Sequence, residues 1–413
     1  MRVKDFTKKV GSGVTPKGGA EVYQDHGVPL FRSQNVTNEG FLLDDIAYIS
    51  EDIDESMSGT RVKPNDVLLN ITGASIGRCY YTPSDFERGN VNQHVCIIRP
   101  TKKIIAPYLY YNLISDIGQR QIDLTQTGSN REGLTKENIC NFEFEVPPLD
   151  IQRRIVSYLD SHILSLDKRV SLLATKRNHY LRLRTAFINL AVTQGLNPDV
   201  KMKDSGIEWI GMIPEHWEIR RIKEIGKLRL GKMLTEKPKE GFVLKPYLKS
   251  KNVSWLNLIL DSVEEMYFSE QELKELRLHY GDLVIAEGGE VGKTAIWRDE
   301  LQDCYLQNSV HKLTCNKHFD SRYYSYFSYF LGQIEYYKSI VNLVSIMHLT
   351  YEKLRRVRVT VPPLSEQQAI STYLDEKCAK IDAIIENLNQ QIDKHKLLKR
   401  ALINEVITGQ RAV

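Results

Sequence analysis

The stretch AEGGEVGKTAIW, residues 286–297, ends in the Gly-Lys-Thr of a phosphate-binding loop, so nucleotide chemistry is the first possibility to examine. A P-loop also needs a glycine five residues before its last glycine, because backbone N–H groups must wrap the phosphates ahead of the lysine. Counting back from Gly292 gives Glu287, a carboxylate that would repel phosphate. The spacing therefore argues against a P-loop, and a nucleotide hydrolase built on Lys293 remains only an alternative hypothesis.

The rest of the sequence lacks the signatures of other catalytic classes. Both Pro-Pro pairs stand in Val-Pro-Pro-Leu, without the Asn or Asp that adenine methyltransferases place before them. No G-x-G-x-x-G opens a strand–helix unit, and no H-x-E is combined with C-x-x-C. The six cysteines have no metal-like spacing and predict reduced thiols. We therefore expect no catalytic residue and no metal site in this chain.

Length and composition set broad limits. A chain of 413 residues has room for two or three domains, and 42% hydrophobic with 26% charged residues is typical of a globular protein. The net charge of +4 is too small to prove a nucleic-acid partner. The start, MRVKDFTKKV, has no apolar signal region, and no run of about 18 apolar residues occurs. These features predict a cytoplasmic protein without a membrane span.

The chain repeats itself. VPPLDIQRRIVSYLD begins at Val146, and VPPLSEQQAISTYLD begins 215 residues later, at Val361. In the same register LTKENI matches LTYEKL and NQHV matches QNSV, and with slight slippage PLFRSQNV answers PYLKSKNV. These pairs cover 134–139 with 349–354, 92–95 with 307–310, and 29–36 with 246–253. The sequence is therefore a tandem duplication.

The duplication bears on the Gly-Lys-Thr stretch, because ITGASIGRC (71–79) is its counterpart in the first copy. Gly77 stands opposite Gly292, and Arg78 stands opposite Lys293. Both copies share an apolar strand, a turn of small residues and a cation. The pattern predicts either a backbone turn pressed against an anionic surface or a plain tight turn with a solvated cation.

A long helix follows each Val-Pro-Pro-Leu. No Gly or Pro interrupts the chain after these motifs until Gly195 or Gly409, which allows about 45 helical residues in each copy. Apolar residues at 3-4 spacing form a heptad seam in both helices, in one register. The seam residues are Leu159, Ile163, Leu166, Val170 and Leu173 in the first, and Leu374, Ile381, Ile385, Leu388 and Ile392 in the second. We expect the helices to pack as an antiparallel coiled coil.

Some seam positions are polar, namely Arg177, Tyr180, Arg184, His395 and Lys399. They could fix the register, reach out to solvent or meet another subunit.

The segments before the helices consist of short β-type runs separated by Gly, Asn and Asp turns, with some helical stretches. They predict compact α/β (α+β) domains. The aromatic stretch SRYYSYFSYFLGQIEYYKS, 321–339, could be a nucleic-acid surface, although half-buried core is the favoured interpretation. The expected order is a first domain at 1–145, a central helix at 146–196, a linker and second domain at 197–360, and a C-terminal helix at 361–413.

These repeated motifs carry a resemblance that spans nearly the whole chain. Together with DSGIEWIGMIPEHWEIRRIKEIG (204–226) and GDLVIAEGGEVGK (281–293), the two VPPL segments resemble the specificity subunit of type I restriction–modification systems. The 204–226 segment leads into a target-recognition domain in that family, and only the second copy has it. The first copy also has Asp150-Ile151-Gln152 where the second has Ser365-Glu366-Gln367.

The resemblance implies a non-catalytic subunit that reads a bipartite, asymmetric double-stranded DNA site, one half per domain. It also implies that the helices act as a ruler and dock two methyltransferase subunits, with restriction and translocase subunits joining for cleavage. S-adenosylmethionine, ATP and Mg would then belong to those partners. A coiled-coil assembly protein without a DNA role is the other alternative.

Repeated polar loops are the expected source of base and phosphate contacts, because amides and guanidiniums read groove edges while Lys and Ser contact phosphates. In the first domain the candidates are Arg32, Ser33, Gln34, Asn35, Arg78, Asn92, Gln93, Ser129, Asn130 and Arg131. In the second they are Lys249, Ser250, Lys251, Asn252, Lys293, Gln307, Asn308 and His348.

Overall fold

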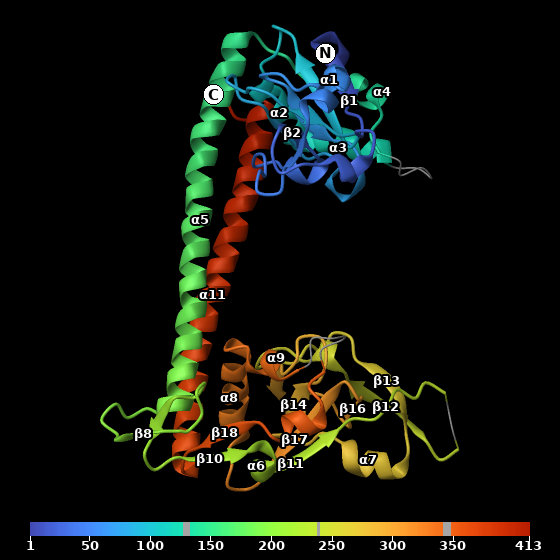
Figure 1. Ribbon diagram of the computed structural model, residues 1–413. Helices are drawn as coiled ribbons and strands as arrows, with labels where there is room; N and C mark the ends of the chain where they lie inside the picture. The colour runs from blue at the N-terminus through green and yellow to red at the C-terminus, as the bar shows by residue number, and fades with distance from the viewer. Residues whose placement is uncertain (127–132, 238–239, 342–347) are drawn as a thin grey trace. The chain divides into compact units, whose positions relative to one another are not determined.

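The computed structural model describes residues 1–126, 133–237, 240–341 and 348–413 (Figure 1). The chain falls into two compact units, one of Met1–Ala174 with Gln390–Val413 and the other of Thr175–Asn389. Each unit contains one α/β domain and part of both long helices. The predicted α/β repeat with two long helices is thus confirmed.

The first domain contains two small sheets. An antiparallel sheet has the strand order β1-β7-β4-β5, and a mixed sheet has the order β3-β2-β6, in which β2 and β6 are parallel. The strands are β1 (Thr7–Ser12), β2 (Val28–Phe31), β3 (Ala47–Ile49), β4 (Val67–Asn70), β5 (Cys79–Tyr81), β6 (Asn90–Val91) and β7 (Val95–Pro100).

Strand β4 is buried on both faces, which explains its continuous apolar run VLL. Val67 and Leu69 pack with helices in one hydrophobic cluster, while Leu68 packs in another with Phe31 and Val91 of the mixed sheet. The helices of this unit are α1 (Glu51–Ser56), α2 (Ala106–Ile114), α3 (Asp116–Gln126), α4 (Lys136–Asn141) and parts of α5 (Leu149–Gln194) and α11 (Leu364–Ile407).

The second domain repeats both sheets strand for strand. The antiparallel order is β11-β17-β14-β15, and the mixed order is β13-β12-β16, with β12 parallel to β16. These strands are β11 (Gly226–Leu230), β12 (Val243–Leu248), β13 (Glu264–Phe268), β14 (Leu283–Ala286), β15 (Thr294–Ile296), β16 (Tyr305–Leu306) and β17 (Val310–Cys315). Two strand pairs are added to this framework: β8 (Met202–Asp204) with β9 (Met212–Pro214), and β10 (Glu218–Arg221) with β18 (Arg358–Val361).

The aromatic helix α8 (Ser321–Gln333) belongs to the core of the second unit. Its buried residues include Tyr323, Tyr324, Tyr326, Phe327, Tyr329 and Phe330. The interpretation as half-buried core is therefore confirmed for this helix. The remaining helices of the unit are α6 (Ile222–Ile225), α7 (Glu270–Leu276), α9 (Tyr336–Ile340) and α10 (Tyr351–Leu354).

The two long helices begin directly after Val-Pro-Pro, at Leu149 and Leu364, and end just before the predicted glycines. Gly195 and Gly409 have φ of +78° and +71°, left-handed values that stop a helix. Helices α5 and α11 lie side by side in Figure 1. Within the second unit Arg177 donates to Asn389 at 3.4 Å, and Arg184 pairs with Asp382 at 3.0 Å. As residue numbers rise along α5 they fall along α11, so the helices pack antiparallel.

The structure shows what two of the polar seam residues do. The Arg184 side chain is only 13% exposed, and both it and Lys399 are paired with a carboxylate of the opposite helix. Among the proposed roles, these contacts favour fixing the register. The predicted apolar seam residues are all buried or half-buried, from Leu159 and Leu374, which are fully buried, to Val170 and Leu173.

Each domain is fastened to the start of its helix by the same two contacts. Gln152 of α5 accepts from the Ile105 N–H at 3.0 Å and donates to the carbonyls of Lys103 and Pro147 at 2.9 and 2.8 Å. Asp160, on the same helix, accepts from the Tyr111 hydroxyl at 2.6 Å.

The second copy repeats these contacts with residues of α11. Gln367 accepts from the Asp320 N–H at 2.8 Å and donates to the Pro362 carbonyl at 2.8 Å, while Tyr326 donates to Asp375 at 2.7 Å. Both glutamines are buried, so the VPPL-x-x-Gln motif is a structural clamp between a domain and its helix.

The lead-in segment, residues 204–226, adds a contact that is specific to the second unit. Trp217 is fully buried, and its Nε1 donates to Glu366 at 2.9 Å, while His216 Nε2 lies 2.6 Å from the same carboxylate. A Cβ on Gly195 would lie 3.1 Å from the Trp217 ring. The segment thus packs against the last turn of α5 and the first turn of α11.

Across the described ranges, no helix combines the length and apolarity needed to cross a membrane. All six cysteines are free thiols, as predicted, and burial raises the pKa of Cys96 to about 12.

Candidate nucleic-acid interface

Three loops of the first domain meet at one edge. Strands β2 and β6 run parallel, so the loop 32–35 and the turn 92–94 leave the mixed sheet at the same end. The turn 71–78 joins them, because the Ile71 N–H donates to the His94 carbonyl at 3.0 Å and the Thr72 hydroxyl lies 2.6 Å from His94 Nδ1. We call this group of loops the first recognition edge.

The second domain builds the same edge from the equivalent loops. Strands β12 and β16 bring the loop 249–252 and the turn 307–309 together, and the Ser250 N–H donates to the Ser309 hydroxyl at 3.0 Å. The turn 287–293 is attached by the Glu287 N–H, which donates to the Ser309 carbonyl at 2.8 Å. His348 lies beside this turn, next to Gly288. We call this group the second recognition edge.

Two predicted candidates lie inside the fold and frame these edges. Asn35 and Asn252 are each only 1% exposed. The Asn35 amide donates to the carbonyls of Leu42 and Asp45 at 2.9 and 3.2 Å, and its Oδ1 accepts from the Arg32 N–H at 3.0 Å. Asn252 makes the matching bonds to Ile259, Ser262 and Lys249. We therefore remove both asparagines from the candidate contact set.

A third interior candidate is Asn92, which is 7% exposed. Its Oδ1 accepts from the His94 N–H at 3.1 Å. In the second copy Gln307 accepts from the Ser309 N–H at 3.0 Å and closes the same kind of turn. These side chains shape the loops that carry the more exposed candidates.

The exposed candidates differ between the copies. Arg78, Gln34 and Gln93 are exposed in the first domain. In the part of the chain that the structure describes, the Arg78 side chain has no hydrogen-bond or ion-pair partner. Gln93 Nε2 lies 2.9 Å from His94 Nε2, and Gln34 donates to the Asp45 carboxylate. Ser33 is half-buried at the same edge. Ser129, Asn130 and Arg131 lie outside the described residues.

In the second domain the cationic candidates are held by carboxylates. Lys249 and Lys251 both donate to Glu264, and these bonds with that of Tyr247 hold the pKa of Glu264 down at about 2. Lys293 pairs with Glu290 at 2.8 Å, and the same carboxylate accepts from the Trp255 ring N–H at 3.0 Å. Asn308 accepts from Gln307, and His348 is exposed.

The Gly-Lys-Thr stretch is a β-hairpin turn between the antiparallel strands β14 and β15. No helix follows it, so the strand–loop–helix of a P-loop is absent from this described segment. Gly292 has φ +82°, and a Cβ there would lie 2.1 Å from the Tyr337 ring. The glycine therefore serves a close backbone packing in a tight turn, and the contact of the neighbouring cation with an anionic surface stays a prediction.

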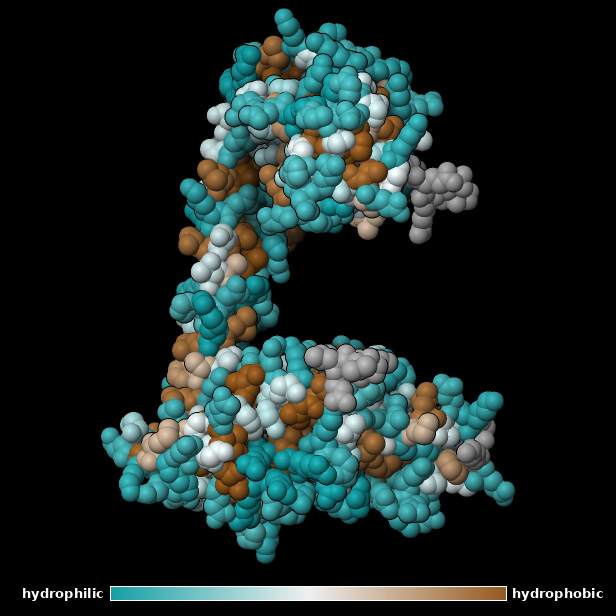
Figure 2. Space-filling model, viewed as in Figure 1, coloured by the Kyte–Doolittle hydropathy of each residue, from teal (hydrophilic) through white to brown (hydrophobic). Residues whose placement is uncertain are grey.

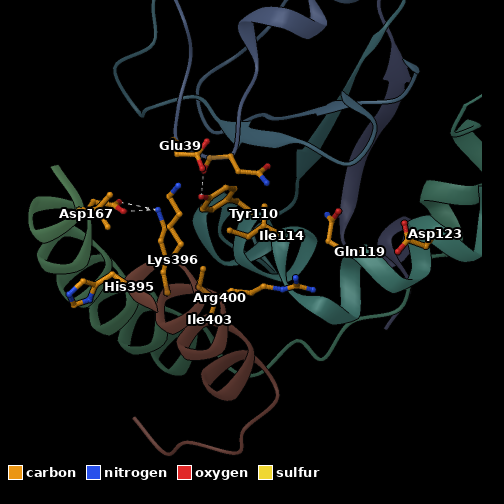
Figure 3. Close-up of a pocket in the computed structure, with 13 residues that line it drawn as sticks. Glu39, Tyr110, Ile114, Gln119, Asp123, Asp167, His395, Lys396, Arg400 and Ile403 are labelled. Carbon is orange, nitrogen blue, oxygen red and sulfur yellow. Dashed lines mark hydrogen bonds and ion pairs between the residues drawn. The ribbon is translucent and has the colours of Figure 1, made fainter. Parts of the chain in front are cut away.

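The helices of the first unit border a cavity of about 640 Å³ (Figure 3). Lys396, Lys399 and Arg400 of α11 line it together with Glu39 and Asp123 of the domain. Its charges are partly satisfied internally, since Lys399 pairs with Asp167 and Arg400 with Asp116 at 2.6 Å. No group of three or more metal-ligating side chains occurs among the described residues.

Apolar side chains also remain exposed on the helices, and Figure 2 shows hydrophobic residues along them. Leu172 of α5 is 70% exposed and Leu397 of α11 is 67% exposed, both away from the seam. Exposed apolar residues mark a surface that another protein covers where they form a contiguous patch, whereas single ones are normal on a protein surface.

Sequence reasoning missed the carboxylates at the recognition edges, Asp45, Glu264 and Glu290. Glu290 lies three residues before Lys293 in the same turn. Asp45 and Glu264 lie 11 to 15 residues from the loop residues that they contact, so nothing in their spacing marks them. The contacts of Asp45 and Glu264 become apparent only in the structure, where β3 pairs with β2 and β13 pairs with β12.

The fold and the two matched edges define a class of protein built from two recognition domains and a pair of long helices. A family profile described as "type I restriction modification DNA specificity domain" matches residues 1–174 and 214–394. The chain belongs to this family: it is a non-catalytic DNA specificity subunit, as the sequence predicted, and neither alternative hypothesis gains support.

Relatives and solved structures agree with this assignment. The chain is similar to the type I restriction enzyme MjaVIII specificity subunit of Methanocaldococcus jannaschii, with 23% identity covering 84% of this chain and 80% of that one. It is also similar to the EcoKI specificity subunit of Escherichia coli, with 20% identity covering 94% and 83%.

Among solved structures, a chain from work on complex assembly of the type I R-M system matches with a TM-score of 0.74 and 16% identity, covering 98% and 96%. The HsdS subunit of Thermoanaerobacter tengcongensis matches with a TM-score of 0.53 and 17% identity, covering 100% and 96%. At these identities the structural matches show the fold.

Proposed function

We propose that each recognition edge reads one half of a bipartite, asymmetric duplex site. The observation that carries the proposal is a contrast within the repeat. The interior framework is the same in both copies, with Asn35 matching Asn252, whereas the displayed side chains differ. Arg32, Gln34 and Arg78 are answered by Lys249, Lys251 and Lys293. A shared framework with different donors suits two half-sites of different sequence.

We also propose that the long helices dock two methyltransferase subunits and that restriction and translocase subunits join this assembly. The exposed leucines of α5 and α11, including Leu172 and Leu397, support the helices as the docking surface. In this scheme S-adenosylmethionine, ATP and Mg are bound by the partners, and the complex acts in the cytoplasm, where its DNA is.

The test is methylation mapping with the chain co-expressed with its methyltransferase partners. Gln34→Ala combined with Arg78→Ala should relax base preference in one half-site only. Lys251→Ala combined with Lys293→Ala should affect only the other half-site, or weaken binding evenly where these lysines contact phosphate. A change in both half-sites caused by first-domain substitutions would contradict one domain per half-site.

A further inference from the structure

Each recognition edge contains a carboxylate that holds two of the displayed side chains. In the second domain Glu264 accepts from Lys249 Nζ at 2.7 and 2.6 Å and from Lys251 Nζ at 2.9 Å. The Tyr247 hydroxyl donates to the same group at 2.8 Å. Two cations of one loop are thus gathered on a single acid whose side chain is 46% exposed.

The first domain has the same arrangement with different residues. Arg32 Nη2 lies 3.4 Å from the Asp45 carboxylate and donates to the Asp45 carbonyl at 2.6 Å. Gln34 also donates to that carboxylate. Arg32 and Gln34 are the repeat counterparts of Lys249 and Lys251, so the same two positions are held in both domains.

The two acids do not correspond in the repeat. Asn35 donates to the Asp45 carbonyl where Asn252 donates to that of Ser262, which aligns Asp45 with Ser262. In the strand pairs, Leu30 lies opposite Ala47 and Tyr247 lies opposite Glu264, which aligns Glu264 with Ala47. The carboxylate therefore comes from a different position in each copy, although it captures equivalent partners. The two copies therefore share the contact between an acid and these two loop positions, but they do not share the position of the acid in the repeat.

Fold stability does not explain such a contact. Exposed ion pairs contribute little to stability, and Glu264 is the exposed first residue of β13. The ion pair should affect DNA binding more than it affects fold stability. Each cation that reaches a phosphate releases a counterion, and this contribution is the same for any DNA sequence. An acid between two lysines suppresses this sequence-independent attraction.

We propose that Glu264 and Asp45 are specificity-determining residues, which keep the loop cations from non-cognate phosphates until cognate groove contacts replace the carboxylate. The inference rests on the proposed reading of DNA by these edges. Each acid competes with DNA for the same hydrogen-bond donors, which are the side chains of the loop that it contacts.

The experiment compares Glu264→Gln with Glu265→Gln in the full-length chain assembled with its methyltransferase partners. Glu265 is the exposed neighbour, and its removal changes the net charge equally. Binding to the mapped cognate duplex and to a scrambled duplex is measured by fluorescence anisotropy between about 50 and 200 mM salt. Thermal melting of each variant checks that the fold is retained.

Glu264→Gln should strengthen binding to scrambled DNA about three- to tenfold more than Glu265→Gln does, and steepen its salt dependence by about one to two units of slope. The cognate duplex should gain less, so the ratio of the two affinities falls. Adding Lys249→Ala and Lys251→Ala to Glu264→Gln should abolish the gain.

In the first domain Asp45→Asn is compared with its exposed neighbour Asp44→Asn, and it should give a smaller gain because only Arg32 is cationic there. Equal effects of Glu264→Gln and Glu265→Gln would overturn the inference. So would altered base preference with unchanged affinity for scrambled DNA, since Glu264 would then read a base itself. Failure of the unsubstituted complex to distinguish cognate from scrambled DNA would instead refute the proposed function.

Discussion

The two domains hold their helices with one shared set of contacts, but only the second adds a buried tryptophan to it. Gln152 and Gln367 both accept from a backbone N–H and both donate to a proline carbonyl, and the Tyr111–Asp160 and Tyr326–Asp375 pairs also match. Trp217 with His216 and Glu366 has no counterpart in the first copy, where Ile151 stands in the place of Glu366.

This difference distinguishes the contacts that hold a domain to its own helix from the contacts that hold the segment between α5 and the second domain. The glutamine and the tyrosine–aspartate pair fasten a domain to its own helix, so both copies keep them. The tryptophan packs where the chain leaves α5 and leads into the second domain, and its carboxylate partner is present only in that copy. The first copy differs from the second in two places: it has Ile151 in place of Glu366, and it lacks the lead-in segment. Both differences concern the same contact, that of Trp217 with Glu366.

The largest expected effect concerns the tryptophan. Trp217→Ala should lower the free energy of unfolding of the second unit by about 3–5 kcal/mol, because it empties a fully buried site. Urea unfolding followed by far-UV circular dichroism measures this. Hydrogen exchange should show the loss at the start of α11 and leave the start of α5 protected. Equal loss at both helix starts would contradict the comparison.

The paired turns provide the next test. Gly292→Ala should destabilise by about 3 kcal/mol, because it adds overpacking against the Tyr337 ring to the strain at positive φ. Gly77→Ala should cost about 1–2 kcal/mol, since its Cβ would meet the Gln119 amide at 2.9 Å, and that side chain can move. Thermal melting of both variants compares them, and a larger effect at Gly77 would refute this difference.

The glutamine clamps should behave alike. Gln152→Ala and Gln367→Ala each leave buried backbone groups unpaired, which costs about 1–3 kcal/mol. We expect similar values from denaturant unfolding of the two variants, with the larger loss for Gln152→Ala because Gln152 also donates to the Lys103 carbonyl. A several-fold difference would show that the clamps are not equivalent.

The smallest effect is a reciprocal exchange. Glu366→Ile should destabilise by about 1 kcal/mol, because the Trp217 ring N–H loses its acceptor. Ile151→Glu should change stability by less than about 0.5 kcal/mol, as no tryptophan is there to receive the carboxylate. Differential scanning calorimetry of both variants is the measurement. A comparable loss in Ile151→Glu would mean that Ile151 has its own packing role.

The sequence predicted the elements that depend on the spacing of apolar residues and on the positions of glycine and proline. The repeat offset, both long helices and the core position of α8 follow from patterns along the chain. The roles of Asn35 and Asn252 did not, because a polar residue between turn residues has the same pattern whether its amide faces solvent or caps the backbone of a neighbouring loop. Glu264 was missed because its partners lie 13 and 15 residues away across a strand pair.

The backbone of the turn around Gly292 is held by hydrogen bonds and by packing within the folded domain. The Gly292 N–H donates to Ala286 at 2.9 Å, the Ala286 N–H donates to Lys293 at 2.8 Å, and the ring of Tyr337 occupies the space where a Cβ would lie. The conformational entropy of this backbone is therefore lost during folding and does not have to be lost again on binding. If this turn contacts DNA as proposed, the entropy of association there should come from the lysine side chain and the released ions, with little backbone ordering.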